Sequence, residues 1–492
     1  MTRRMASFFL TGFLATGGLG AFAMEADETG AGQLAGVWQG WADPGHHQVV
    51  FNIKYNPDQT FIGTLDIPEQ GLSGIPLESV TWEKGRVHMA CALKNASYNG
   101  RINDEGSGIM GKWGKGDWLT LNLTKSPGPP VERPPNEKVR AMESKMKADA
   151  ELEPRKPYPY GEEDVSFAGA GEGVTLAGTL TLPEGKGPFP AVILLAGSGP
   201  VDRDETVAWH RVFLVLSDYL TRQGIATLRY DKRGVGGSSG DYAKATTRDF
   251  ADDARSALSY LRGRKEVDPG KIGLLGHSEG GLIAPMVAVD SPGVSYLVLL
   301  AAPALDGEEI LIRQNLYYLQ AAKAGEEILE IDRSVQKEIF RVLRSGQGRE
   351  AALGKIRAIE EDTRRRIGKL DPGIAEKISA QMKDQENFLL SPWMRYFIDY
   401  APRGALEKVR CPVLALDGDG DFQVASKENL PVLEEALGKA GNRDCTIREW
   451  KNANHLFQVH GAGGPGDYSD ATPTPARPVL EYITDWIKRH AH

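Results

Sequence analysis

Short runs in which apolar and polar residues alternate occupy residues 34–125. Gly, Asn and Asp residues separate these runs, which are QVVFNIKY, TFIGTLDIP, RVHMACAL, GIMGKW and DWLTLNLTK. Such alternation is typical of strands that bury one face, and the turn residues between them indicate antiparallel pairing. We therefore expect residues 34–125 to form an N-terminal β-sandwich or small barrel domain.

From residue 163 onward, continuous apolar runs alternate with amphipathic stretches. The apolar runs are FPAVILLAG, IATLRYD, KIGLLG, SYLVLLAA and CPVLALDG. Strands that are apolar on both faces are typical of a parallel sheet covered by helices on both sides. The pattern predicts an α/β domain over residues 163–490 with a mostly parallel sheet, in which loops at the carboxyl ends of the strands carry the ligand chemistry.

Two segments depart from these patterns. Residues 126–135 hold five prolines in ten residues, which excludes a helix interior or a central strand. Together with the charged helical stretch that follows, they predict a Pro-rich linker with a short helix over residues 126–162. Residues 306–402 carry long, charged helical sequence between two apolar runs. We expect this segment to be a helical cap inserted into the α/β domain, with its charges on solvated helix faces.

The first residues have a different composition. Arg3 and Arg4 precede an apolar run from Phe8 to Phe22, which ends in the small-residue pattern Ala-Phe-Ala at 21–23. This arrangement is typical of a secretory signal peptide, so residues 1–23 predict export to the periplasm or the extracellular space. An uncleaved anchor is the alternative, but a membrane span needs about 20 predominantly apolar residues and this run is short and Gly-rich. We expect no membrane span in the mature chain.

Charge and cysteine content narrow the range of partners. A formal net charge of −8 disfavours nucleic acid, because affinity for nucleic acid comes from neutralising phosphates. The cysteines have no metal-ligand spacing. Cys411 and Cys445 open two predicted strands. If those strands are parallel neighbours, both thiols lie at one sheet edge, where a disulfide can join them in an oxidising compartment.

The clearest chemical motif is GHSEGG at 276–281, between the apolar strand KIGLLG and the apolar helix LIAPMVAVDS. A G-x-S-x-G pattern in this context makes a sharp turn that exposes a serine hydroxyl at a helix N-terminus. Ser278 is therefore the predicted nucleophile. A second match, GGSSG at 236–240, lies in a glycine-rich loop with no apolar helix after it. We favour Ser278 over Ser238 on that context.

A serine nucleophile needs a positioned base to take its proton. His455 follows the strand CTIREW after a short turn, where a loop histidine can reach back over the sheet, and it is the predicted base. His460, five residues later in a Gly-rich loop, is the alternative. His490 and His492 end the terminal helix and are expected at the surface.

The base in turn needs a carboxylate to orient it. The strand CPVLAL ends in three acidic residues, Asp417, Asp419 and Asp421. We favour Asp421, because it lies furthest along the loop and precedes a turn into the next helix; Asp417 and Asp419 remain alternatives. Such an Asp/Gly cluster can also bind calcium, but it lacks the glutamate at the twelfth position of an EF-hand loop. We expect no metal and no organic cofactor.

Two backbone amides are needed to bind the oxyanion. Glu279, directly after the nucleophile, supplies one. The other is expected from the loop at 196–200, with Ser198 as the candidate and Gly197 as the alternative. The charged residues 203–205 follow in the same loop, and they either order it by ion pairing or contact a polar substrate group.

Residues 164–490 resemble a group of bacterial α/β-hydrolases, mostly esterases or peptidase-like hydrolases. The matching stretches are GSGPVDRDE, RYDKRGVGGSS, GHSEGG, the SPWMRYFIDYAP segment before CPVLALDGDGDFQV, and NANH. The resemblance implies the α/β-hydrolase fold and a triad of Ser278, Asp421 and His455. It also implies that RYDKRG, with Asp231 and Arg233, organises a loop beneath the site. The oxyanion loop departs from the family, since it begins Ala-Gly where many α/β-hydrolases have His-Gly, and this leaves the second oxyanion donor open.

These residues predict a serine hydrolase that cleaves small-molecule carboxylic esters through a Ser-His-Asp triad and an acyl-enzyme intermediate. A serine peptidase with the same triad, acting on peptides, is the first alternative. A catalytically silent carbohydrate- or protein-binding scaffold is the second. Its platform would be four tryptophans of the β domain, namely Trp38, Trp41, Trp113 and Trp118. The aromatic residues at 393–400 in the cap either line a substrate pocket or pack the cap on the core.

Overall fold

In a computed structural model the chain forms two compact units, and the boundary between them in the sequence lies between Glu151 and Leu152. The structure describes residues 31–491 except for 43–46, 58–59, 84, 92–95, 104, 115–118, 131–132, 209, 376–387, 460–467 and 469–473. The predicted signal peptide at 1–23 therefore lies outside the described residues. No helix within the described ranges is long and apolar enough to cross a membrane.

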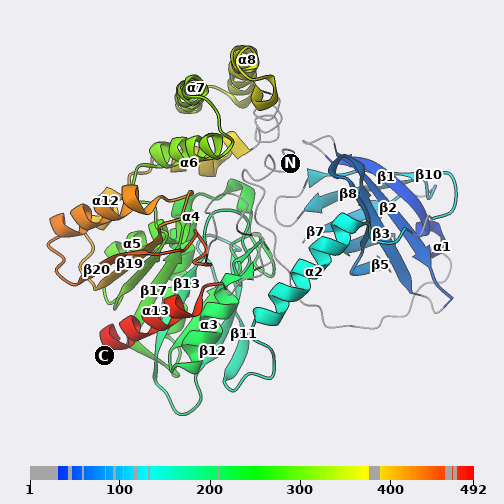
Figure 1. The fold of residues 1–492 in the computed structure, drawn as a ribbon. Helices are drawn as coiled ribbons and strands as arrows, with labels where there is room; N and C mark the ends of the chain where they lie inside the picture. The colour runs from blue at the N-terminus through cyan, green and yellow to red at the C-terminus, as the bar shows by residue number, and fades with distance from the viewer. Residues whose placement is uncertain are drawn as a thin grey trace. The chain divides into compact units, whose positions relative to one another are not determined.

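The N-terminal unit is an antiparallel sheet that wraps around its own core (Figure 1). The order of the hydrogen-bonded strands is β4-β3-β2-β1-β10-β8-β7-β6-β5, with β9 paired to β8. The bounds are β1 Gly36–Ala42, β2 His47–Tyr55, β3 Phe61–Ile67, β4 Leu72–Pro76, β5 Ser79–Glu83, β6 Arg86–Cys91, β7 Ala96–Ile102, β8 Gly108–Gly114, β9 Leu119–Thr120 and β10 Leu123–Ser126. Two helices also belong here, α1 Ala31–Leu34 and α2 Glu137–Leu152. The all-β prediction for this region is confirmed.

The tryptophans of this unit are distributed between its core and its surface. Trp38 is fully buried and its indole donates a hydrogen bond to the Leu34 carbonyl at 2.7 Å. Trp113 packs against Phe51 with ring centroids 5.7 Å apart. Trp41, by contrast, is 58% exposed. The tryptophans that the structure describes here therefore do not form one exposed platform; Trp118 lies outside the described residues.

The C-terminal unit is built on an eight-stranded mixed sheet in the order β11-β12-β16-β13-β17-β18-β19-β20. The first strands are antiparallel, and every pair from β16–β13 to β19–β20 is parallel. The bounds are β11 Gly161–Ala168, β12 Thr175–Leu182, β13 Phe189–Leu195, β16 Ala226–Tyr230, β17 Val267–His277, β18 Leu297–Leu300, β19 Val413–Gly418 and β20 Cys445–Trp450, with a separate hairpin of β14 Thr206–Val207 and β15 His210–Arg211. The predicted α/β-hydrolase fold is confirmed.

Helices cover both faces of this sheet because the central strands are apolar on both sides. Along β13, Ile193 and Leu195 belong to one buried cluster, whereas Val192 and Leu194 belong to the other. The first cluster packs under α4 Thr247–Arg262, α5 Glu279–Asp290 and α12 Ser426–Lys439, and the second under α3 Val212–Arg222 and α13 Arg477–His490. The alternation of side chains along a strand thus supplies two cores from one apolar run.

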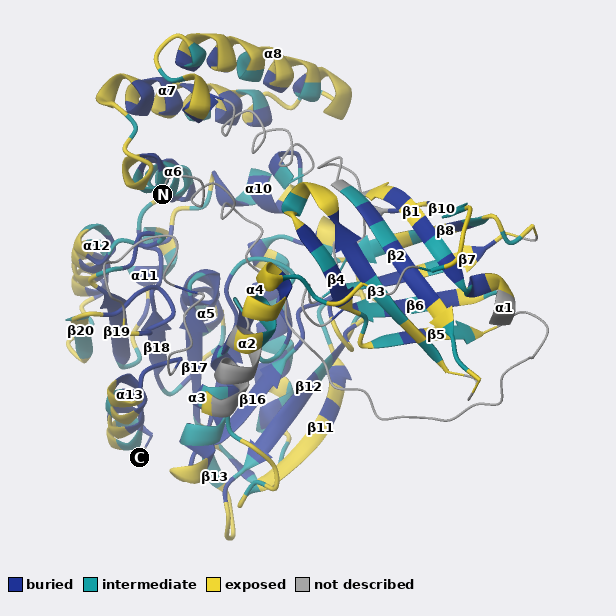
Figure 2. Cartoon of the chain, turned by 45° about the vertical axis from the view of Figure 1, so that its right-hand side comes forward, coloured by how far each residue is buried: buried dark blue, intermediate teal, exposed yellow. Residues whose placement is uncertain are grey.

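A helical segment is inserted between β18 and β19, as the charge pattern predicts. It consists of α6 Gly307–Ala321, α7 Glu326–Arg344, α8 Arg349–Gly368, α10 Pro392–Phe397 and α11 Arg403–Leu406. Figure 2 shows that α7 and α8 each have a buried face and an exposed face. On α7 the buried side chains recur at helical spacing, from Ile328 and Ile331 through Val335 to Ile339. The charged residues of α7 are exposed except for Asp332, which is buried and accepts hydrogen bonds from Asn315 and Gln336.

The register of β19 and β20 decides the question of a disulfide. The two strands are parallel neighbours, as expected, but Cys445 lies opposite Val413, two residues beyond Cys411. Both thiols are free. Burial raises the pKa of each thiol to about 11, so neither is a ready nucleophile for disulfide exchange.

Candidate active site

Ser278 lies at the sharp turn between β17 and α5. Its backbone has φ 52° and ψ −118°, a strained conformation for a residue with a side chain. The turn is held by a bond from the Ser278 amide to the Leu300 carbonyl at 2.9 Å. Its flanks must be glycine. A Cβ at Gly276 would lie 2.0 Å from the Gly280 carbonyl oxygen, and one at Gly280 would lie 1.9 Å from that of Leu195. This is the geometry that the GHSEGG motif predicts.

Asp421 and His455 lie together at the carboxyl end of the sheet. Nδ1 of His455 is 2.6 Å from Oδ2 of Asp421, and both residues are buried. The other oxygen, Oδ1, accepts the backbone amides of Gln423 at 2.7 Å and Val424 at 2.9 Å. A carboxylate fixed in this way holds the proton on Nδ1 and leaves Nε2 as the basic nitrogen, the form that a general base requires.

The elbow and the base are joined through the residue that precedes the nucleophile. Nε2 of His277 lies 2.9 Å from the backbone oxygen of His455, and the two rings are 4.8 Å apart between centroids. The structure thus brings the loop of the predicted base against the turn of the predicted nucleophile. This contact was not anticipated from the sequence.

The alternative acids, Asp417 and Asp419, are not paired with His455 in the structure. Asp417 is 1% exposed, and neither carboxyl oxygen has a hydrogen-bond partner among the described residues. Burial and the nearby charge of Asp421 hold the pKa of Asp417 well above its usual range, which favours its protonated form. Asp419 faces Lys451 at 3.8 Å. Within the described part of the chain, no three His, Cys, Asp or Glu side chains form a metal site. His460 lies outside that part.

Ser238 and His490, which the sequence analysis considered and set aside, have structural roles. The Ser238 hydroxyl donates to the Asp231 carbonyl at 2.7 Å and accepts the Ala177 amide at 2.9 Å, and the residue is buried. Its bonds link a loop to β12. His490 stacks on Trp486 at 3.9 Å between centroids.

The loop expected to hold the oxyanion lies against the elbow. A Cβ at Gly197 would be 3.2 Å from the Ser278 Cβ. The Gly197 amide already donates to Oε1 of Glu205 at 2.6 Å, which removes it as an oxyanion donor. The amides of Ser198 and Glu279 donate no hydrogen bond to a described residue. Of the two loop candidates, Ser198 is therefore the one whose amide is available.

A buried ion pair connects this loop to the elbow. Nζ of Lys232 donates to the Gly197 carbonyl at 2.5 Å and to Oε2 of Glu279 at 3.0 Å. The Gly197 carbonyl and the Ser198 amide belong to one planar peptide unit and point in opposite directions. Lys232 therefore fixes the direction of the Ser198 amide.

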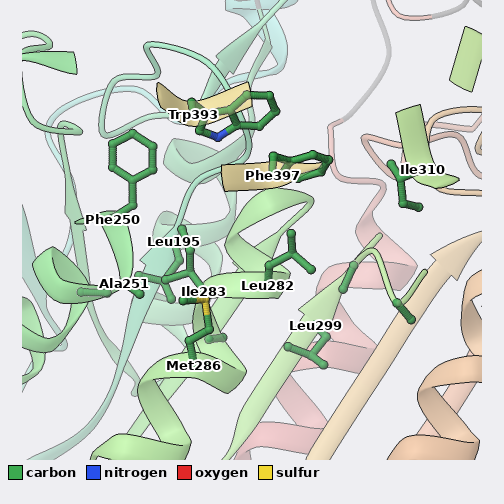
Figure 3. Packing of buried hydrophobic residues seen from close by; sticks show 14 of the residues in the cluster. Leu195, Phe250, Ala251, Leu282, Ile283, Met286, Leu299, Ile310, Trp393 and Phe397 are labelled. Atoms are coloured by element: carbon green, nitrogen blue, oxygen red, sulfur yellow. The ribbon is translucent and has the colours of Figure 1, made fainter. Parts of the chain in front are cut away.

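The other oxygen of Glu279 binds the cap. Oε1 accepts the Thr247 hydroxyl and the Trp393 indole N–H, each at 2.6 Å. Trp393 stacks on Phe397 at 4.6 Å between centroids, and Figure 3 shows both rings above Leu282. These two aromatic residues of the cap are buried in the core cluster, so they pack the cap on the domain beneath it.

The charged residues after the oxyanion loop are ordered by ion pairing. Arg203 makes two bonds to Asp231, with Nε at 3.2 Å from Oδ1 and Nη2 at 2.8 Å from Oδ2. Asp204 pairs with Arg229. Arg233 reaches Asp253 through Nε and Nη2, each at 2.7 Å. The RYDKRG motif therefore ties this loop to the end of β16 through Arg229 and Asp231, and it binds α4 through Arg233.

Residues 210–345 match the protein family described as serine aminopeptidase, S33, a range that includes Ser278 but neither Asp421 nor His455. Esterase EstD of Thermotoga maritima is 28% identical over 335 residues, which cover 67% of this chain and 68% of EstD. An uncharacterized 31.7 kDa protein of Escherichia coli is 23% identical over 319 residues, 65% of this chain and 96% of that protein.

Solved structures show the same range of coverage. The α/β hydrolase GrgF from Penicillium is 18% identical, with a TM-score of 0.42 over 67% of this chain and 99% of that one. An esterase of Pyrococcus furiosus is 15% identical, with a TM-score of 0.41 over 69% of this chain and 98% of that one.

Proposed function

Because the chain belongs to the α/β-hydrolase superfamily, we propose that it is a serine hydrolase that cleaves carboxylic esters with Ser278, His455 and Asp421. The observation that carries the proposal is the 2.6 Å contact between Asp421 and His455. The backbone oxygen of His455 is in turn hydrogen-bonded to His277, the residue directly before the strained Ser278. The likeness to an esterase supports an ester as the substrate.

In the proposed reaction, Ser278 Oγ attacks the ester carbonyl carbon while His455 Nε2 takes the hydroxyl proton. The amides of Ser198 and Glu279 bind the oxygen that becomes negative. The bond to the alcohol then breaks, and His455 protonates the leaving alcohol. Water, deprotonated by His455, attacks the acyl-enzyme and releases the carboxylic acid and free Ser278.

Covalent labelling tests the nucleophile. We expect a fluorophosphonate to modify Ser278, as located by mass spectrometry, and Ser278→Ala to lose both labelling and hydrolysis of p-nitrophenyl acetate. The matched control is Ser238→Ala, which removes a hydroxyl from the other G-x-S-x-G sequence and leaves the active-site residues unchanged. A fully active Ser278→Ala variant, or labelling at another serine, would contradict the assignment. An unlabelled but folded protein would favour a silent scaffold.

A serine peptidase is the second candidate, supported by the match of residues 210–345 to the S33 aminopeptidase family. A peptidase uses the same triad but must also protonate an amine leaving group. A panel of p-nitrophenyl esters and aminoacyl p-nitroanilides separates the two. We expect the wild type to have a higher kcat/KM for the esters than for the anilides, and Ser278→Ala to be inactive on both. Efficient turnover of the anilides would identify the protein as a peptidase instead.

We propose in addition that residues 1–23 direct export of the chain, from the two arginines and the apolar run described above. The protein recovered from the periplasm or the medium should begin at Met24. Recovery of the uncut chain from the cytoplasm would contradict this proposal.

A further inference from the structure

Three buried groups form a continuous path from the oxyanion loop to the loop of the base. The Gly197 amide donates to Oε1 of Glu205 at 2.6 Å, and the same oxygen lies 2.9 Å from Nδ1 of His277. Nε2 of His277 lies 2.9 Å from the His455 carbonyl. Glu205, His277 and His455 are 0%, 2% and 3% exposed. Segments separated by 72 and 178 residues in the sequence are thus joined by two side chains.

The acceptors along this path define the protonation of His277. The His455 carbonyl can only accept, so Nε2 of His277 carries a hydrogen. Burial lowers the pKa of His277, but the charge of Glu205, its hydrogen bond and the His455 carbonyl together raise it more, and Asp421 adds to the rise. Both ring nitrogens of His277 therefore face acceptors, Nδ1 toward Glu205 and Nε2 toward His455, and the raised pKa favours the charged form of this ring.

The backbone at Glu205 indicates that this arrangement is imposed on the chain. Glu205 has φ 46°, in the left-handed region that residues with a side chain rarely adopt. Its second oxygen, Oε2, is buried and has no hydrogen-bond partner among the described residues. A strained and incompletely bonded carboxylate is a poor device for stability alone. Such features are found where function requires a fixed position.

We propose that Glu205 and His277 are positioning residues that hold the oxyanion loop and the catalytic base at a fixed separation. The inference rests on the proposed function, because the two groups that they connect must act on one carbonyl at the same time. Neither side chain exchanges a proton with the substrate. Their contribution is to preorganise the Gly197–Ser198 segment and the His455 backbone before the ester binds.

The test compares Glu205→Gln and His277→Gln with the wild type on p-nitrophenyl acetate. A misplacement of about 1 Å at a reacting group lowers the rate by about 100-fold. We therefore expect kcat to fall about 10- to 100-fold in each variant, with KM changed much less, since both side chains are buried and act through the backbone. The rate of fluorophosphonate labelling at Ser278 should fall by a similar factor. The matched control is Glu153→Gln, which removes a carboxylate paired with Arg211.

The double variant distinguishes positioning from separate structural effects. If Glu205 and His277 act as one unit, the double variant should lose no more activity than the worse single variant. Multiplying losses, or an unchanged kcat in folded variants, would overturn the proposal. If one variant does not fold, as judged by circular dichroism, the other still tests the kcat change. Failure of the proposed function is a different result, because the wild type itself would then remain unlabelled.

Discussion

Replacing Lys232 with methionine would remove one partner of an ion pair that solvent barely reaches. The side chains of Lys232 and Glu279 are 5% and 1% exposed, with Nζ 3.0 Å from Oε2. Breaking a buried ion pair from one side costs about 3–5 kcal/mol, because the remaining charge loses its counter-charge. Thr247 and Trp393 still donate to Oε1 of Glu279. We therefore expect the free energy of unfolding to fall by about 3 kcal/mol, the lower end of that range.

The assay is urea unfolding followed by circular dichroism, together with p-nitrophenyl acetate turnover. A double-mutant cycle with Glu279→Gln separates the effect of the unpaired charge from that of the lost side chain, since the double variant Lys232→Met/Glu279→Gln holds no unpaired ion. We expect the double variant to regain at least half of the free energy of unfolding that Lys232→Met loses. Because Lys232 also fixes the Gly197–Ser198 peptide unit, kcat should fall in both variants that lack the lysine. A loss of stability below about 1 kcal/mol, the value of an exposed pair, would refute the reasoning.

Two other substitutions test neighbouring contacts. Trp393→Phe keeps an aromatic ring but removes the indole N–H that donates to Glu279. A hydrogen bond to a charged group contributes about 1.5–3 kcal/mol, so the free energy of unfolding should fall by that amount. The control is Trp450→Phe, whose indole donates to no described residue and whose loss should change the free energy of unfolding little. Equal losses in both would show that the indole bond contributes nothing. Asp417→Asn tests how stability depends on pH. Because the pKa of Asp417 is raised in the folded state, the contribution of this carboxyl group to stability is fully present below its unfolded pKa of about 3.8 and is lost as pH rises through the folded pKa. The variant, which cannot titrate, should therefore gain stability relative to the wild type as urea midpoints are measured from pH 4 to pH 8, and a constant difference would contradict the assignment.

The parts of the site that follow from local sequence were predictable. The elbow depends on Gly276 and Gly280, whose positions within one motif determine the turn. The positions of Asp421 and His455 follow from the rule that loops at the carboxyl ends of parallel strands lie together. The structure places these two side chains in contact, although their roles in catalysis remain predictions. Fold class was equally accessible, because the change from alternating to continuous apolar runs marks the two units.

The contacts that support the site were not predictable, because they join residues that are far apart in the sequence. His277 and Glu205 are separated by 72 residues, and Trp393 and Glu279 by 114. The only signal was a charged or polar residue directly after an apolar strand, as with His277 and Glu279 in GHSEGG or Lys232 in RYDKRG. The sequence could not decide whether the two cysteines form a disulfide, for a related reason. Strand order placed Cys411 and Cys445 on neighbouring strands, but the sequence does not specify the two-residue offset between them.

These supporting contacts converge on one peptide unit and its neighbour. Glu205 binds the Gly197 amide and Lys232 binds the Gly197 carbonyl, so the loop is held on both sides by buried charges. Glu205 continues through His277 to the base, and Lys232 continues through Glu279 to the cap. Since Ser198 N–H shares a plane with the Gly197 carbonyl, its direction is set before any substrate is present. An α/β-hydrolase whose oxyanion loop begins Ala-Gly can in this way preorganise the second donor with one side chain from the same loop, Glu205, and one from the RYDKRG segment, Lys232. Displacement of either side chain would change the position of the Ser198 amide.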